Sequence, residues 1–116
     1  MLGISFKPDS DDLRDSPALE IATQLSGLGA KVLVHDPVSL EALSLKQPAL
    51  IPQEDVAAGF SEADLVILGT EWKQYKELDP SKLDARTNTV IDGRNVLDVP
   101  KWQGAGWKVI ALGRNL

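Results

Sequence analysis

The feature that most constrains the fold is a series of short apolar, β-branched runs, separated by turn residues and segments with helical spacing. The runs are LGISF (2–6), KVLVHD (31–36), DLVILGT (64–70), TVIDG (89–93) and KVIAL (108–112), with a weaker one at ALI (49–51). They are continuous rather than alternating, which is typical of strands buried on both faces of a parallel sheet. The sequence therefore predicts a Rossmann-like α/β fold, a three-layer α/β/α sandwich around a mainly parallel sheet of about five to six strands.

Helical segments lie between the predicted strands, as parallel connections require. The best begins at Ser16-Pro17, a cap followed by proline at the first helical position, and ends at 27–29; weaker ones cover about 39–45, 54–60, 80–83 and 99–103. We expect residues 1–116 to form one domain that can fold alone. The first predicted strand lacks the lead-in that a buried central strand normally has, so we also expect this chain to be a piece of a longer one.

The composition argues against several classes of function. The chain has 12 Lys and Arg against 17 Asp and Glu, a net charge of -5, which disfavours general affinity for nucleic acid or anionic membranes. Cysteine is absent and His35 is the single histidine, so thiolate chemistry, disulfides and His-rich zinc sites are excluded within this chain. No apolar run approaches the roughly 20 residues of a membrane span, and the first residues lack the basic-then-apolar order of a secretion signal, so we expect neither. The expected location is the cytoplasm.

Two cations follow strands of the predicted sheet. Ligands of open parallel sheets bind beyond the carboxyl ends of the strands, beside the point where the strand order reverses. Lys7 follows the first strand and Arg94 follows the fourth. When the weak run at 49–51 is counted as a strand, the common 3-2-1-4-5 order places them two strands apart, about 10 Å, and their side chains can converge on a diphosphate. The alternative is that each cation pairs with a neighbouring Asp, and position alone does not decide between the two.

The segment FKPDSDDLRD (6–15) places basic residues among acids. Arg14 lies just before a helix start, where the helix dipole disfavours a cation. It has either a functional role or a plain ion pair with Asp11 or Asp12. A calcium loop would need glycine where Arg14 stands, so we predict instead that the acids cap the helix, accept turn hydrogen bonds and orient Lys7 and Arg14.

Dinucleotide and catalytic sites are incomplete in this sequence. No Gly-x-Gly-x-x-Gly fingerprint lies between the first strand and the first helix. Asp36 ends the second strand, where NAD-binding folds place a ribose-binding acid, but without those glycines the Asp36-Pro37 pair predicts a turn and helix cap. Trp72 and Tyr75 could stack on a base, although buried packing is the simpler interpretation. No catalytic residue and no metal site emerges.

Several motifs occur in the order and spacing of a known family. LGISFKPDSDDLRDSPALEI, KVLVHDPV, ADLVILGTEWKQYKEL, TVIDGRNVLD and GWKVIALGR follow one another along nearly the whole chain. In this order they resemble the C-terminal, UDP-binding domain of the UDP-glucose/GDP-mannose dehydrogenases. Phe-Lys-Pro followed by Asp-Asp-x-Arg, together with Thr-Glu-Trp, is most similar to the UDP-glucose branch. The GDP-mannose and UDP-N-acetylhexosamine branches remain alternatives.

The resemblance implies part of a cytosolic enzyme, a UDP-glucose 6-dehydrogenase. Such an enzyme oxidises UDP-glucose to UDP-glucuronate with two NAD, through a covalent thiohemiacetal on a cysteine, and is usually a homodimer or larger. In the family, the NAD site and the cysteine belong to an N-terminal NAD-binding domain and a central helix. Both are absent from this chain, which by itself is then expected to be inactive.

The resemblance also assigns residues. Phe6 and Lys7 match positions that contact the nucleotide-sugar, Arg94 matches an arginine that also grips it, and Arg14 matches a residue that reaches the NAD. Two alternatives of other classes stay open. One is a free-standing nucleotide-binding or regulatory module, and the other is an interaction domain that binds no nucleotide.

Overall fold

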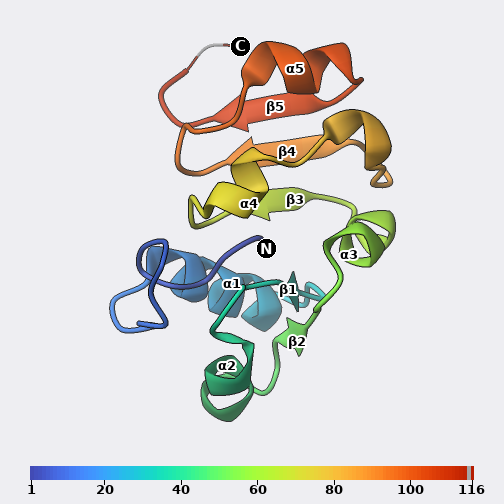
Figure 1. Ribbon diagram of the computed structural model, residues 1–116. Helices are drawn as coiled ribbons and strands as arrows, with labels where there is room; N and C mark the ends of the chain where they lie inside the picture. Colours follow the sequence, from blue (N-terminus) through green and yellow to red (C-terminus); the bar gives the residue numbers. More distant parts are fainter. Residues whose placement is uncertain (115) are drawn as a thin grey trace.

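The computed structural model describes residues 1–114 and 116, in which helices and strands alternate along the chain (Figure 1). The elements are α1 (Pro17–Gly27), β1 (Leu33–Val34), α2 (Leu40–Lys46), β2 (Ile51–Pro52), α3 (Val56–Glu62), β3 (Val66–Leu68), α4 (Lys73–Lys76), the 3-10 helix η1 (Pro80–Lys82), β4 (Thr89–Asp92), α5 (Val99–Gly104) and β5 (Lys108–Ala111). All but α4 fall at or within about two residues of the predicted ranges. Helix α4 has four residues, too few to show a helical period.

Every strand pair among the described residues is parallel. β1 pairs with β2, and β4 lies between β3 and β5. Leu2 joins the two sheets, because it bridges His35 beside β1 and Leu68 in β3. The order across the molecule is therefore β2, β1, Leu2, β3, β4, β5. This confirms the predicted parallel α/β pattern and the reversal of strand order at the first strand.

The first predicted strand is much shorter than residues 2–6, since only Leu2 pairs. Gly3 has a φ of 83°, and a Cβ there would lie 2.6 Å from the Cβ of Thr70. Beyond it, the Phe6 N–H donates to the Asp12 carbonyl at 2.8 Å, so the chain has already turned back on itself. The segment that the sequence extends as a strand is instead a loop fixed at the carboxyl edge of the sheet.

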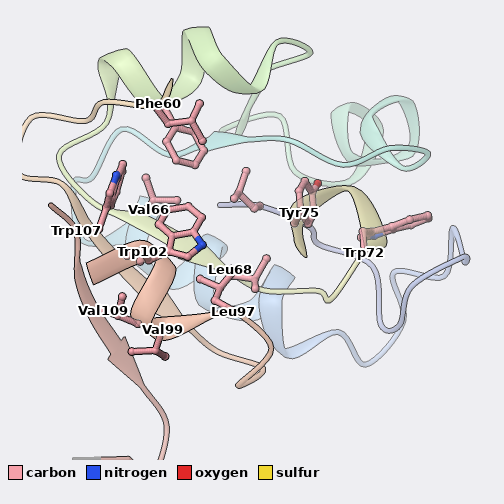
Figure 2. Close-up of a cluster of buried hydrophobic side chains, with 13 residues drawn as sticks. Phe60, Val66, Leu68, Trp72, Tyr75, Leu97, Val99, Trp102, Trp107 and Val109 are labelled. Carbon is pink, nitrogen blue, oxygen red and sulfur yellow. The ribbon is translucent and has the colours of Figure 1, made fainter. Parts of the chain in front are cut away.

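The larger apolar cluster lies between the β3-β4-β5 sheet and the helices α3 and α5 (Figure 2). The rings of Trp102 and Trp107 meet edge to face at 5.1 Å, and Phe60 meets Trp107 at 5.7 Å. Valines in register on three neighbouring strands belong to the same cluster: Val66, Val90 and Val109. Trp102 and Trp107 thus pack helix α5 onto the sheet.

Helix α1 covers the opposite face. Side chains alternate between faces along a strand, so Gly69 shares the face of Ile67 rather than that of Val66. A Cβ at Gly69 would lie 2.7 Å from the Cβ of Ala18 in α1. The smaller apolar cluster includes Ala22 of this helix. Helices therefore lie on both faces, which agrees with the predicted three layers.

The predicted start of α1 is confirmed. The Ser16 hydroxyl accepts the Leu19 N–H at 3.2 Å, and Pro17 occupies the first turn. Ser16 Oγ also donates to the Ile4 carbonyl at 2.5 Å. One side chain therefore caps the helix and anchors the loop between Leu2 and the helix.

Candidate functional site

Asp92 fixes the loop that carries Arg94. Its carboxylate is fully buried at the end of β4 and accepts the N–H groups of Arg94 (3.1 Å), Val96 (2.8 Å) and Leu97 (2.9 Å). Gly93 is required by packing, because a Cβ there would lie 2.8 Å from a carbonyl oxygen of β3. The Asp-Gly pair therefore sets the backbone from which the Arg94 side chain extends.

The Arg94 side chain spans the carboxyl ends of neighbouring strands. Its Nε donates to the Gly69 carbonyl at 3.1 Å and lies 3.3 Å from Glu71 Oε2. Its Nη2 donates to the Phe6 carbonyl at 3.1 Å. The segments that follow Leu2, β3 and β4 therefore meet on one guanidinium. Arg94 pairs with an acid, as the alternative interpretation held, but the acid comes from another strand end rather than from a neighbouring Asp.

The guanidinium retains donors for a ligand. Arginine has five N–H groups, and the contacts above use the one on Nε and one on Nη2. The others, on Nη1 and Nη2, are uncommitted to protein acceptors among the described residues, and the side chain is 30% exposed. An arginine held along one edge and open along another is suited to bidentate recognition of a phosphate.

Phe6 and Lys7 lie on the loop that Arg94 contacts. Phe6 is 47% exposed, which is unusual for so large an apolar side chain, and Lys7 is exposed as well. Within the described part of the chain, Lys7 forms no ion pair with an acid. Ser5 Oγ donates to the Lys7 carbonyl at 3.1 Å and accepts from Trp72 Nε1 at 3.3 Å, so the backbone here is held in place. An exposed ring and an unpaired cation therefore lie next to the Arg94 contact.

Arg14 forms an ion pair with Asp12. Its Nε and Nη2 lie 3.1 and 3.2 Å from the two carboxylate oxygens. These hydrogen bonds lower the pKa of Asp12 and raise the pKa of Arg14. The predicted local ion pair is thus present. The Arg14 side chain is nevertheless 82% exposed, so the pair leaves the guanidinium open to solvent.

Asp36 is committed to backbone donors. Its Oδ2 accepts the N–H groups of Ile4 (3.0 Å) and Ser5 (3.3 Å), and its Oδ1 accepts those of Val38 (3.0 Å) and Ser39 (2.9 Å). The predicted turn before α2 is confirmed, whereas the predicted helix cap is not, because Ser39 is the N-cap residue of α2. Both carboxylate oxygens of Asp36 are therefore occupied by backbone donors.

Trp72 and Tyr75 are packing residues, both buried in the larger cluster (Figure 2). The Tyr75 hydroxyl lies 2.7 Å from His35 Nδ1 and donates to the His35 carbonyl at 3.2 Å. Burial lowers the pKa of His35 and raises the pKa of Tyr75. Over residues 1–114 and 116, no group of three or more His, Cys, Asp or Glu side chains is placed to hold a metal ion, and no helix has the length and apolar character of a membrane span.

Glu71 and Asp92 are the site residues that the sequence did not single out. Glu71 was visible only as part of Thr-Glu-Trp after the third strand, and Asp92 only as the end of the fourth. A signal existed for Glu71, since an acid and a base that follow neighbouring parallel strands must lie close together. The strand order considered from the sequence already made these two strands neighbours, and β3 does pair with β4, so this signal was available.

Comparison with known proteins identifies the family of this chain. Residues 1–99 match the UDP binding domain of the UDP-glucose/GDP-mannose dehydrogenase family. The chain belongs to this family. It is 33% identical over 117 residues to the UDP-glucose 6-dehydrogenase TuaD of Bacillus subtilis (strain 168), across 98% of this chain and 25% of that protein. The resemblance inferred from the motifs is therefore confirmed.

Solved structures agree with this membership in the UDP-glucose/GDP-mannose dehydrogenases. A UDP-glucose dehydrogenase from the hyperthermophilic archaeon Pyrobaculum islandicum is 35% identical, with a TM-score of 0.72 over 97% of this chain and 24% of that one. The NDP-N-acetyl-D-galactosaminuronic acid dehydrogenase from Methanosarcina mazei Go1 is 29% identical, with a TM-score of 0.81 over 99% of this chain and 24% of that one. The chain thus spans about a quarter of the length of the relatives it matches.

Proposed function

We propose that this chain is the nucleotide-sugar-binding domain of an NAD-dependent UDP-glucose 6-dehydrogenase, which oxidises UDP-glucose to UDP-glucuronate with two NAD. Membership of the family and the names of its relatives support this proposal. The observation that carries it is Arg94, whose guanidinium is held by the segments that follow three strands and keeps donors for an anion. The carboxyl edge of the sheet is where such folds bind their ligands.

In this proposal the cations bind the diphosphate of the UDP-sugar. Arg94 offers a planar pair of N–H donors, whereas Lys7 adds a compact charge that no described acid neutralises. The exposed Phe6 ring gives an apolar surface for the nucleoside or the sugar. Binding energy from the diphosphate then orients the C6 alcohol for hydride removal elsewhere in the enzyme.

NAD would be held mainly outside this chain. NAD accepts the hydride in the complete enzyme. In this chain, however, the Asp36 carboxylate already accepts backbone N–H groups, and the turn after Leu2 has no glycine loop to hold a dinucleotide. The chain also contains no cysteine to serve as a nucleophile. We assign both functions to an N-terminal NAD-binding domain and central helix of the same polypeptide, and expect this chain alone to be inactive. The exposed Arg14 would reach the dinucleotide across the cleft between the domains.

The proposal further places the enzyme in the cytoplasm as a homodimer or larger assembly, with no nucleic-acid or membrane partner. The same domain from a UDP-N-acetylhexosamine or GDP-mannose dehydrogenase is a second candidate, favoured by the TM-score of 0.81 to the NDP-N-acetyl-D-galactosaminuronic acid dehydrogenase. Titration with UDP-glucose, UDP-N-acetylglucosamine and GDP-mannose separates these candidates. A stand-alone regulatory module would bind nucleotide in the absence of any dehydrogenase partner, and an interaction domain would bind none.

Isothermal calorimetry with UDP tests the site. Arg94→Ala removes charge-assisted hydrogen bonds to phosphate and should weaken UDP binding by at least about tenfold. Arg86→Ala is the control, since Arg86 is an exposed arginine that pairs with Asp64 just ahead of β3, at the amino edge of the sheet. Its dissociation constant should equal that of the unaltered protein. Equal affinity of the Arg94 variant and the unaltered protein for UDP would remove Arg94 from the site. If the unaltered protein gave no binding heat with UDP or with GDP, nucleotide binding itself would be overturned.

A further inference from the structure

Ser5 is a point where separate segments of the chain meet. It is fully buried, and each of its polar groups has a partner. Its N–H donates to Asp36 Oδ2 at 3.3 Å, and its carbonyl accepts from Thr70 Oγ1 at 2.8 Å. Its hydroxyl accepts from Trp72 Nε1 at 3.3 Å and donates to the Lys7 carbonyl at 3.1 Å. Ser5 therefore cannot shift without breaking several hydrogen bonds at once.

Trp72 sets the direction of the Ser5 hydroxyl. An indole nitrogen can only donate, so the hydroxyl oxygen must accept the Trp72 proton. The hydroxyl has one proton of its own, which goes to the Lys7 carbonyl. With the indole in place, the serine proton is therefore directed at Lys7. Without the indole N–H, the hydroxyl can rotate and its bond to Lys7 loses its orientation.

The loop that carries Phe6 and Lys7 is held through its backbone. The Phe6 carbonyl accepts from Arg94 Nη2 at 3.1 Å. The Lys7 carbonyl accepts from Ser5, and the proline that follows restricts Lys7 to an extended backbone. Both side chains are exposed. The backbone contacts therefore fix where the two side chains begin and leave the side chains themselves open to a ligand.

The segment that follows β3 contacts both cation-bearing parts of the predicted site. Trp72 reaches the loop of Lys7 through Ser5. Glu71, its neighbour in the chain, lies 3.3 Å from Arg94 Nε. One short segment therefore helps to set the relative positions of the two cations.

Trp107 shows what a buried tryptophan does elsewhere in this fold. Trp72 and Trp107 belong to the same apolar cluster and lie at opposite ends of it in Figure 2. Both indoles are buried, and Trp107 Nε1 donates to the Pro80 carbonyl at 3.2 Å. Because Trp107 directly precedes β5, it lies at the amino edge of the sheet, away from Arg94. The two tryptophans therefore pack alike and differ in what their N–H groups hold.

We propose that Trp72 and Ser5 are positioning residues of the nucleotide-sugar site. The Trp72 N–H orients the Ser5 hydroxyl, which fixes the backbone from which Lys7 reaches the diphosphate. This inference rests on the proposed function, which assigns Lys7 to the diphosphate. Lysine has a long flexible stem, and a mobile backbone would add to the freedom that it loses on binding. A backbone fixed in advance lowers that cost and raises the affinity.

Calorimetric titration with UDP compares Trp72→Phe with the matched control Trp107→Phe. Each substitution keeps an aromatic ring in the cluster and removes one indole N–H. Trp72→Phe should raise the dissociation constant about fivefold, the equivalent of one net hydrogen bond. Trp107→Phe should change it by less than about twofold, although both variants should melt at a lower temperature. Equal affinity of the two variants for UDP would overturn the proposal.

A double-mutant cycle separates positioning from a general loss of structure. In a Lys7→Ala background, Trp72→Phe should change UDP affinity by less than about twofold, because the side chain that Trp72 positions is gone. A fivefold loss that persists in this background would overturn the role assigned to Trp72.

Backbone ¹⁵N relaxation of the nucleotide-free protein gives a readout that does not require UDP. Ser5→Ala removes the hydroxyl that holds Lys7, and Ser39→Ala is the control, since Ser39 is also fully buried but its hydroxyl has no hydrogen-bond partner among the described residues. The order parameter of the Lys7 amide should fall from about 0.85 to below about 0.6 in Ser5→Ala and stay unchanged in Ser39→Ala. An equal order parameter in the two serine variants would overturn the proposal. If the unaltered protein gave no binding heat with UDP, the proposed function would fail, and the relaxation result would still decide whether Ser5 holds Lys7.

Discussion

Replacement of Asp92 by asparagine tests whether one buried carboxylate organises the site. The substitution keeps the size of the side chain and changes only its hydrogen-bonding groups. The carboxylate now accepts three backbone N–H donors, one on Oδ1 and two on Oδ2. Asparagine has one acceptor oxygen and an NH₂ group that cannot accept. At least one donor must then face another donor.

The expected cost follows from these contacts. The best orientation keeps the oxygen on the Val96 and Leu97 N–H groups and leaves the Arg94 N–H unpaired, which costs about 1–3 kcal/mol. The two retained bonds change from charge-assisted to neutral, at about 1 kcal/mol each. The sum is about 3–5 kcal/mol, a large share of the roughly 5–15 kcal/mol that stabilises a typical domain.

Urea unfolding followed by tryptophan fluorescence measures this change, since Trp72, Trp102 and Trp107 are all buried. Asp98→Asn is the matched control. Asp98 is exposed and caps α5 through the Lys101 N–H at 3.3 Å, a position where asparagine serves about as well as aspartate. Its free energy of unfolding should change by less than about 0.5 kcal/mol.

Asp92→Asn should also weaken UDP binding, because the loop that aims Arg94 loses an anchor. A loss of stability below about 1 kcal/mol would refute the reasoning, since it would mean that the buried donors find other partners. Equal losses for the Asp92 and Asp98 variants would refute it as well, because the cost would then not depend on burial.

Three other substitutions have defined outcomes. Glu71→Gln removes the acid beside Arg94 but leaves its carbonyl contacts, so calorimetry should show UDP binding that is tighter by about twofold to tenfold; weaker binding would contradict competition by Glu71. Burial lowers the pKa of His35, so the unfolded state binds its proton more readily and stability should rise with pH from the folded pKa to about 6.5. In His35→Gln, pH-dependent urea titrations should lose that slope. Gly69→Ala places a Cβ 2.7 Å from helix α1 and should lower the melting temperature, whereas Gly104→Ala, with nothing within 4 Å, should leave it equal or higher.

Much of the fold follows from local patterns. Continuous apolar runs identified the parallel strands, Ser16-Pro17 marked the start of α1, and the motifs in series led to the family. The site was predicted in part. Arg94 and the loop with Phe6 and Lys7 were expected on one edge, and the structure brings Arg94 to the Phe6 carbonyl. Glu71, as the partner of Arg94, was not foreseen.

The sequence by itself determined the class of fold, the order of its elements and the family, because strand burial, helix capping and motif spacing depend on residues close together in the chain. Only the tertiary structure decided where the first strand ends and which acid faces Arg94. Each of these depends on contacts between distant segments, such as Gly3 with Thr70 or Arg94 with Phe6, 88 residues apart. Contacts between residues so far apart in the sequence cannot be predicted from the residues near either one.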